Sequence, residues 1–118
     1  MSALDPDRLA MFTGTNHYHR LTRRYLLTDG TKHLSDTAGA YWLMDAIASH
    51  LDEIGVADWF VVVRITVKNT EALMVYEDGN GHEYARQAIP YTDFPMAEMT
   101  VFCSFDGEIW VLMLPNEY

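Results

Sequence analysis

The sequence of 118 residues has a single cysteine, four prolines and no long hydrophobic run. Because Cys103 has no second cysteine to pair with, no internal disulfide forms, and a reducing cytoplasmic compartment is favoured. The longest apolar runs, 59–63 and 109–114, are too short to span a bilayer, and the first residues lack the basic and apolar regions of a signal peptide. We therefore expect a cytoplasmic protein without a membrane segment.

Basic residues are also scarce: eight lysines and arginines stand against 17 acidic residues, a net charge of −9. Residues 35–118 contain three basic and fourteen acidic residues, a net charge of −11. Such a surface repels nucleic acid, so we expect no direct binding of nucleic acid. The excess of acid either keeps the protein soluble or suits a basic protein partner.

Apolar residues make up 49% of the sequence and aromatic residues 13%, which excludes a wholly disordered chain. The length suits one domain, and no repeat or linker divides it. We expect a single domain over 1–118, with a helical and extended part at 1–55 and an antiparallel sheet at 56–118.

The main helix is expected at Ala40–Ile54, followed by Gly55 as a helix stop. Its apolar stripe recurs at helical spacing and consists of Ala40, Leu43, Met44, Ile47, Leu51 and Ile54. A short helix at Gly30–Asp36 is expected to have Asp29 as its N-cap. A further short helix is expected to begin after Asp5.

After this helical part the pattern changes to alternation, which predicts strands. The expected strands are Asp58–Lys68, Glu71–Glu77, Glu83–Ile89, Thr100–Phe105 and Glu108–Leu114. Residues 17–28 are expected to form a strand or an extended arm that bends at Arg23 and Arg24, and Met96–Met99 one helical turn. The expected fold class is α+β: an antiparallel β-meander of four to five strands packed on N-terminal helices.

No catalytic or metal-binding signature is present. Five histidines, including His17 and His19, show none of the usual zinc spacings, so we expect no metal and no cofactor. Cys103 lies within a predicted strand, which favours a core residue over a nucleophile. Asp45 and Asp52 share a helix face and His50 points away from them, which indicates a solvated edge. We expect no enzyme activity, although a small enzyme that uses Asp45 or the histidines stays an alternative.

Candidate binding residues are acidic and cluster around the predicted loops. They are Glu77, Asp78, Glu83, Asp93 and Glu98, together with Tyr91. Their ordinary interpretation is loop solvation, and their functional interpretation is a negative surface for a basic partner. Tyr41, Trp42 and Asp45, at the start of the main helix, are secondary candidates, because aromatic residues recur at interfaces.

Several stretches together resemble a family of small uncharacterised bacterial proteins. They are Phe12–Thr15, Leu27–Gly30 with Lys32, Gly39–Leu43, Asp45–Ser49, Tyr91–Pro95 and Leu114–Tyr118. The resemblance covers nearly the whole chain. It implies an origin on plasmids, phages or other mobile elements, and it supplies no catalytic residue.

These observations lead to a functional hypothesis: a non-enzymatic, acidic protein-interaction domain that binds a basic nucleic-acid-binding protein. An anti-defence inhibitor of the anti-CRISPR or anti-restriction type is its specific form. A self-associating domain, in which edge strands pair between copies as a homo-oligomer, stays a further alternative.

Overall fold

A computed structural model describes residues 14–54, 60–92 and 94–118. Its elements are β1 (His19–Thr22), β2 (Tyr25–Leu27), α2 (Asp29–Ala38), α3 (Tyr41–Ile54), β3 (Phe60–Lys68), β4 (Glu71–Glu77), β5 (Glu83–Ile89), β6 (Glu98–Phe105), β7 (Trp110–Met113) and the 3-10 helix η1 (Pro115–Glu117). The helix expected after Asp5 lies outside the described residues. None of the helices among these residues is long and apolar enough to cross a membrane.

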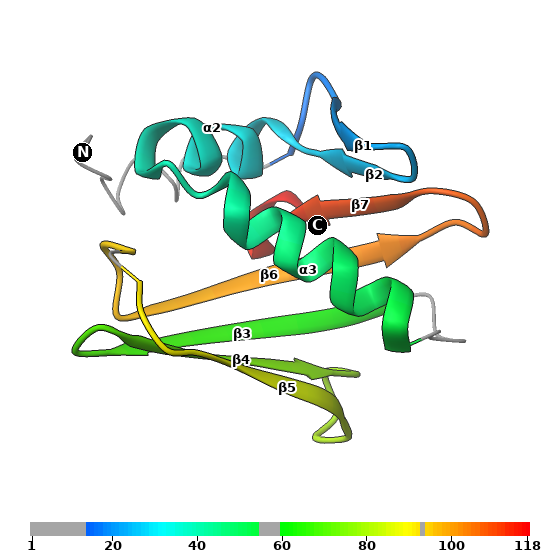
Figure 1. Cartoon of the computed structure of the whole chain (residues 1–118). Helices are drawn as coiled ribbons and strands as arrows, with labels where there is room; N and C mark the ends of the chain where they lie inside the picture. Colours follow the sequence, from blue (N-terminus) through cyan, green and yellow to red (C-terminus); the bar gives the residue numbers. More distant parts are fainter. Residues whose placement is uncertain (1–13, 55–59, 93) are drawn as a thin grey trace.

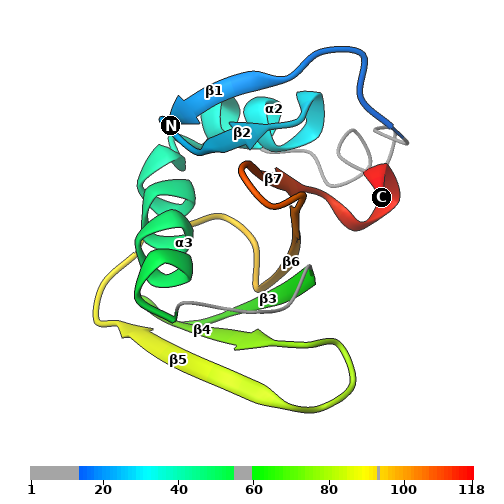
Figure 2. The ribbon, with the colours of Figure 1, turned by 90° about the vertical axis from the view of Figure 1, so that its right-hand side faces the viewer.

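The strands form one seven-stranded sheet in the order β1-β2-β7-β6-β3-β4-β5. Every neighbouring pair is antiparallel except β2 and β7, which run parallel. The sheet curves into an arc, and α3 lies on its concave side (Figure 2). The sheet is therefore mixed, and its arc curves around α3.

The predicted antiparallel meander of four to five strands is wrong. β6 pairs with β3 instead of β5, because the chain between β5 and β6 returns from the edge strand to the free side of β3. In addition, the β1–β2 hairpin precedes the helices and extends the sheet beside β7. Alternation shows which face of a strand is buried, but it does not show which neighbour the strand will choose.

The bounds of the individual helices and turns agree better with the prediction than the strand order does. The helix expected at Ala40–Ile54 begins one residue later, and the bend at Arg23 and Arg24 is confirmed as the turn between β1 and β2. The α2 helix is longer than predicted, and its N-cap is Thr28 instead of Asp29. Met96–Met99 does not form the predicted helical turn, because β6 already begins at Glu98.

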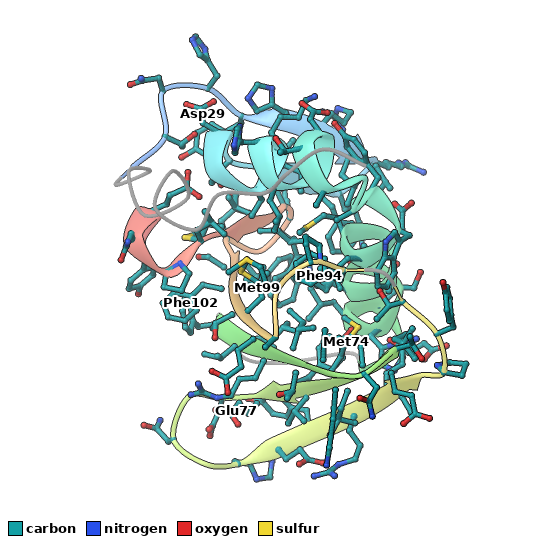
Figure 3. The ribbon with its side chains drawn as sticks, turned by 90° about the vertical axis from the view of Figure 1, so that its left-hand side faces the viewer. Asp29, Met74, Glu77, Phe94, Met99 and Phe102 are labelled. Carbon is teal, nitrogen blue, oxygen red and sulfur yellow. The ribbon has the colours of Figure 1, made fainter. Side chains whose placement is uncertain are left out.

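The core lies between α3 and the concave face of the sheet. Leu43, Met44 and Ile47 of α3 have no exposed surface. They belong to one cluster with buried strand residues, which include Val61, Val63, Met74, Val101 and Cys103. Figure 3 shows Met74 and Phe94 on this side of the sheet and Glu77 on the other. Cys103 is fully buried, as its strand position predicted, and burial raises the pKa of its thiol.

Candidate functional site

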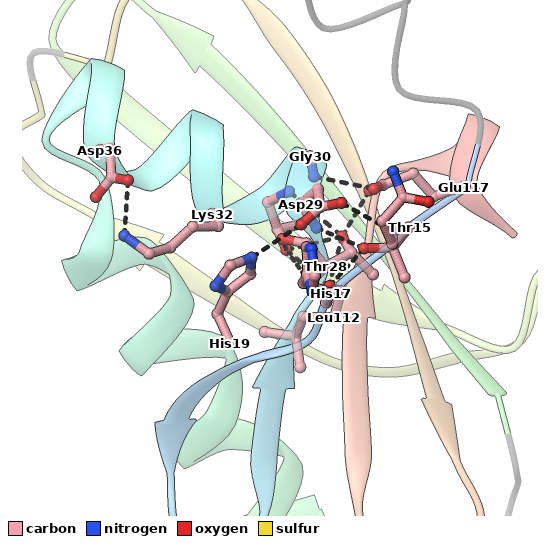
Figure 4. Close-up of polar contacts among 12 residues, drawn as sticks. Thr15, His17, His19, Thr28, Asp29, Gly30, Lys32, Asp36, Leu112 and Glu117 are labelled. Atoms are coloured by element: carbon pink, nitrogen blue, oxygen red, sulfur yellow. Dashed lines mark hydrogen bonds and ion pairs between the residues drawn. The ribbon is translucent and has the colours of Figure 1, made fainter.

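Three separate stretches of the chain meet at the first turn of α2 (Figure 4). Thr28 and Thr31 form a capping box, in which the Thr28 hydroxyl accepts the Thr31 amide and the Thr31 hydroxyl accepts the Thr28 amide. The Thr31 hydroxyl also donates to the carbonyl oxygen of Leu112 in β7, at 2.8 Å. The helix start is therefore joined directly to the parallel strand beside β2.

The C-terminal stretch supplies a carboxylate to this turn. Glu117 accepts hydrogen bonds from the Gly30 amide at 2.9 Å, the Thr28 hydroxyl at 2.6 Å and the Leu114 amide at 2.9 Å. A carboxylate is favourable at a helix N-terminus, where backbone N–H groups lack partners inside the helix. A β carbon at position 30 would overlap the ends of the Glu117 and Leu114 side chains, so these would have to shift to make room for it.

The stretch before β1 is attached through Asp29. The Asp29 carboxylate lies 2.9 Å from His19 Nε2 and accepts the Asn16 amide at 2.9 Å. The Asp29 amide donates to the Thr15 hydroxyl at 2.8 Å. The hydrogen bond with His19 and the one from the Asn16 amide lower the pKa of Asp29 to about 2. Asp29 is thus an anchor for the preceding chain.

One turn further along α2, Lys32 donates to Asp36 at 2.7 Å and lies 5.5 Å from the centre of the Tyr41 ring. The Tyr41 hydroxyl donates to the same carboxylate. The hydrogen bond from Lys32 holds the pKa of Asp36 below its ordinary value. This set ties the start of α3 to α2.

The carboxylates of this network are occupied by donors from the protein itself. Asp29, Asp36 and Glu117 each accept at least two hydrogen bonds. Two stretches that carry the family resemblance, Leu27–Gly30 and Leu114–Tyr118, meet in this network. These contacts have a structural role, because they attach both ends of the described chain to α2. We call this network the α2 junction.

The acidic loop residues predicted to form a binding surface are not gathered in one place. Glu77, Asp78 and Glu83 lie at the turn between β4 and β5. Tyr91 and Glu98 follow the other end of β5. Asp93 lies outside the described residues.

Most of the β4–β5 group has partners within the protein. Arg64 donates to Glu77 at 2.8 Å, and Arg86 donates to Glu83 at 2.6 Å. The Asp78 carboxylate accepts the amides of Asn80 and His82 and thereby shapes the turn. These acids are largely used by the fold, although they remain exposed or half-buried.

The secondary candidates lie on α3. Tyr41 is 38% exposed and Asp45 is exposed, whereas Trp42 is half-buried and packs against the core. Two further exposed acids, Asp52 and Glu53, lie on the last turn of the same helix. We call Asp45, Asp52 and Glu53 the α3 acidic face. The shared face of Asp45 and Asp52 was visible in the sequence, whereas the hydrogen bond from the Tyr25 hydroxyl to Asp52 was not.

Among the hollows at the surface of the described residues are three with volumes of about 470, 580 and 340 Å³. Neither Asp45 nor a histidine lines any of the three. His50 instead stacks on Tyr76, with 5.0 Å between ring centres. Within the described ranges, no three His, Cys, Asp or Glu side chains are grouped to hold a metal ion. These hollows therefore do not form the acid–base site that the enzyme alternative requires.

Comparisons with known proteins give a family and a related fold. The model of a family of unknown function, DUF6876, matches residues 5–118. The fold is similar to the crystal structure of a protein of unknown function from Enterococcus faecalis. The TM-score is 0.58 over 86% of this chain and 98% of that chain, at 18% sequence identity. This likeness concerns the fold alone. No curated protein matches the sequence.

Proposed function

This chain belongs to DUF6876, a family of unknown function, and from that premise we propose that it is a binding domain whose α3 acidic face docks a basic region of a partner protein. The supporting observation is that this face has no basic side chain of its own. Over its 14 residues α3 contains no lysine or arginine, while Asp45, Asp52 and Glu53 are exposed on it.

The cations among the described residues form no ion pair with this face. Lys32, Arg64 and Arg86 form ion pairs with Asp36, Glu77 and Glu83, respectively. Arg20, Arg23 and Arg24 lie in the β1–β2 hairpin, and Lys68 ends β3. Among the described residues, the α3 acidic face therefore forms no salt bridge, although Arg23 and Arg24 line a hollow together with Asp52. Its negative charge favours a basic partner.

The position of two of these acids costs stability. Asp52 and Glu53 lie in the last turn of α3, where the helix dipole presents its negative end and the turn itself contains no basic residue. Each unfavourable charge of this kind costs about 0.3–1 kcal/mol. A lysine or arginine from a partner would relieve that cost on binding, so this placement favours an interaction over mere solubility.

Nucleic-acid-binding proteins are the partner class that suits this face, because they present clustered lysines and arginines. In its specific form, the proposal is that this protein is an anti-defence inhibitor. By covering the basic surface of such a partner, it would compete with the nucleic acid that the partner binds. An origin of this protein on a mobile element would agree with a role as an anti-defence inhibitor.

The test compares two variants of equal charge. One is Asp45→Asn/Asp52→Asn/Glu53→Gln, and its matched control is Glu71→Gln/Glu98→Gln/Glu108→Gln, at exposed acids on other elements. Tagged wild type, variant and control are used to capture proteins from a bacterial lysate at low and high salt. We expect basic proteins on wild type and control, their loss from the α3 variant, and their release by salt.

Equal capture by the two variants would show that overall charge, and not the α3 acidic face, controls binding. Recovery of no basic protein, or capture that salt does not weaken, would refute the electrostatic proposal.

A further inference from the structure

A basic hairpin protrudes from this acidic protein at one edge of the sheet. Arg23 and Arg24 form the tight turn between β1 and β2 (Figure 1). Arg20 donates from its guanidinium to the Arg23 carbonyl at 2.8 Å, and the Trp110 amide donates to the Arg24 carbonyl at 2.8 Å. The backbone of both turn residues is therefore held, while their side chains are exposed.

A hollow of about 340 Å³ lies beside this turn. It is lined by Thr22, Arg23, Arg24, Tyr25 and Asp52. One water molecule occupies about 30 Å³ in the liquid, so the hollow has room for an oxyanion and several waters. Its lining residues carry two guanidinium groups and two hydroxyls, of which the Tyr25 hydroxyl already donates to Asp52.

Unlike Lys32, Arg64 and Arg86, the two turn arginines form no ion pair with a carboxylate among the described residues. Arg64 and Arg86 form ion pairs at 2.8 and 2.6 Å. Within the described part of the chain, Arg23 and Arg24 form no such pair, although Asp52 lines the same hollow. Two guanidinium groups therefore form no ion pair with the described carboxylates, in a protein whose net charge is −9.

Asp52, which lines the same hollow, accepts a hydrogen bond from another donor. The hydroxyl of Tyr25 donates to the Asp52 carboxylate at 2.5 Å. Tyr25 is only 2% exposed, and burial, followed by the hydrogen bond to Asp52, raises the pKa of its hydroxyl. The hydroxyl stays protonated at neutral pH and keeps Asp52 as its acceptor.

We propose that this hollow is an oxyanion site, in which Arg23 and Arg24 bind a phosphate or carboxylate group of a ligand and Thr22 donates a further hydrogen bond. Guanidinium forks suit this role because they bind such groups through two parallel hydrogen bonds. Asp52 weakens the attraction without reversing it, since two positive charges face one negative charge. The ligand group comes either from a small phosphate ester or from a phosphorylated or acidic side chain of a protein.

The test is an NMR titration of the full chain with inorganic phosphate, at constant ionic strength maintained with sodium chloride. Saturable shifts are expected at the amides of residues 22–25 and 52–53. Arg23→Gln/Arg24→Gln should weaken binding by about tenfold or more, because each charge-assisted contact is lost. The control Lys68→Gln removes an exposed cation elsewhere and should change affinity by less than about twofold.

A second variant tests the role of the carboxylate in the opposite direction. Asp52→Asn removes the negative charge from the hollow and should raise phosphate affinity several-fold. Melting temperatures of all variants verify that they fold. Since phosphate needs no partner protein, a failure here is distinct from a failure of the α3 proposal.

The two sources of the oxyanion are separated by a second probe, a short phosphoserine peptide. Saturation by inorganic phosphate supports a small-molecule ligand, and saturation by the peptide alone supports a protein side chain. The proposal is overturned if neither probe saturates, if shifts spread equally over all basic residues, or if Lys68→Gln weakens binding as much as the arginine variant.

Discussion

Replacement of Gly30 by alanine should destabilise the protein, although alanine is the better helix former. In an open helix position, Gly→Ala stabilises by about 0.5–1 kcal/mol. At position 30 the added β carbon would overlap the Glu117 carboxylate and Leu114, and Glu117 would have to leave the Gly30 amide. Loss of that hydrogen bond leaves the Gly30 amide without its acceptor and costs about 1–3 kcal/mol, so the sign of the effect reports on the contact.

The assay is urea denaturation, with the midpoint and slope measured for each variant. Gly14→Ala is the matched control, because nothing lies within 4 Å of its β-carbon position. Glu117→Ala should by itself cost about 2–3 kcal/mol, since the Gly30 and Leu114 amides and the Thr28 hydroxyl lose their acceptor. For a domain of this size that corresponds to a fall of about 8–12 °C in melting temperature.

A double-mutant cycle completes the test. In the Glu117→Ala background, Gly30→Ala should cost less by about 1 kcal/mol or more, because part of the overlap is gone. Strict additivity, or stabilisation by Gly30→Ala in the wild-type background, would refute the inferred junction between α2 and the C-terminal stretch.

Three further predictions follow from single contacts. The pKa of Asp29 is lowered to about 2, so its contribution to stability is present above its unfolded pKa, near 4, and is lost as the pH falls toward 2. Urea midpoints of wild type and Asp29→Asn should therefore converge toward pH 2, and a constant difference would contradict this account. Cys103 should not react with thiol reagents in the native state, and Cys103→Ser should cost about 1–3 kcal/mol by burying an unsatisfied hydroxyl. Rapid native labelling would disprove its burial. Tyr25→Phe should lower stability by about 1 kcal/mol through loss of the hydrogen bond to Asp52, and Asp52→Asn in that background should add little.

The sequence by itself determined the local elements, because periodicity is a property of neighbouring residues. The stripe that includes Leu43, Ile47 and Leu51 marks α3, and these side chains are indeed buried. Alternation marks β4 and β5 at the predicted bounds, Glu71–Glu77 and Glu83–Ile89. The shared face of Asp45 and Asp52 follows from helical spacing in the same way.

Only the tertiary structure decided which strands are neighbours and which charges are neutralised. Backbone hydrogen bonds are alike for every residue, so nothing in β6 specifies β3 over β5 as its partner. The contact between Gly30 and Glu117 joins residues 87 positions apart, and the pairing of Arg64 with Glu77 depends on the β3–β4 register. Ion pairs and caps of this kind depend on the distances between separate segments of the chain. The order of residues along the sequence does not give these distances.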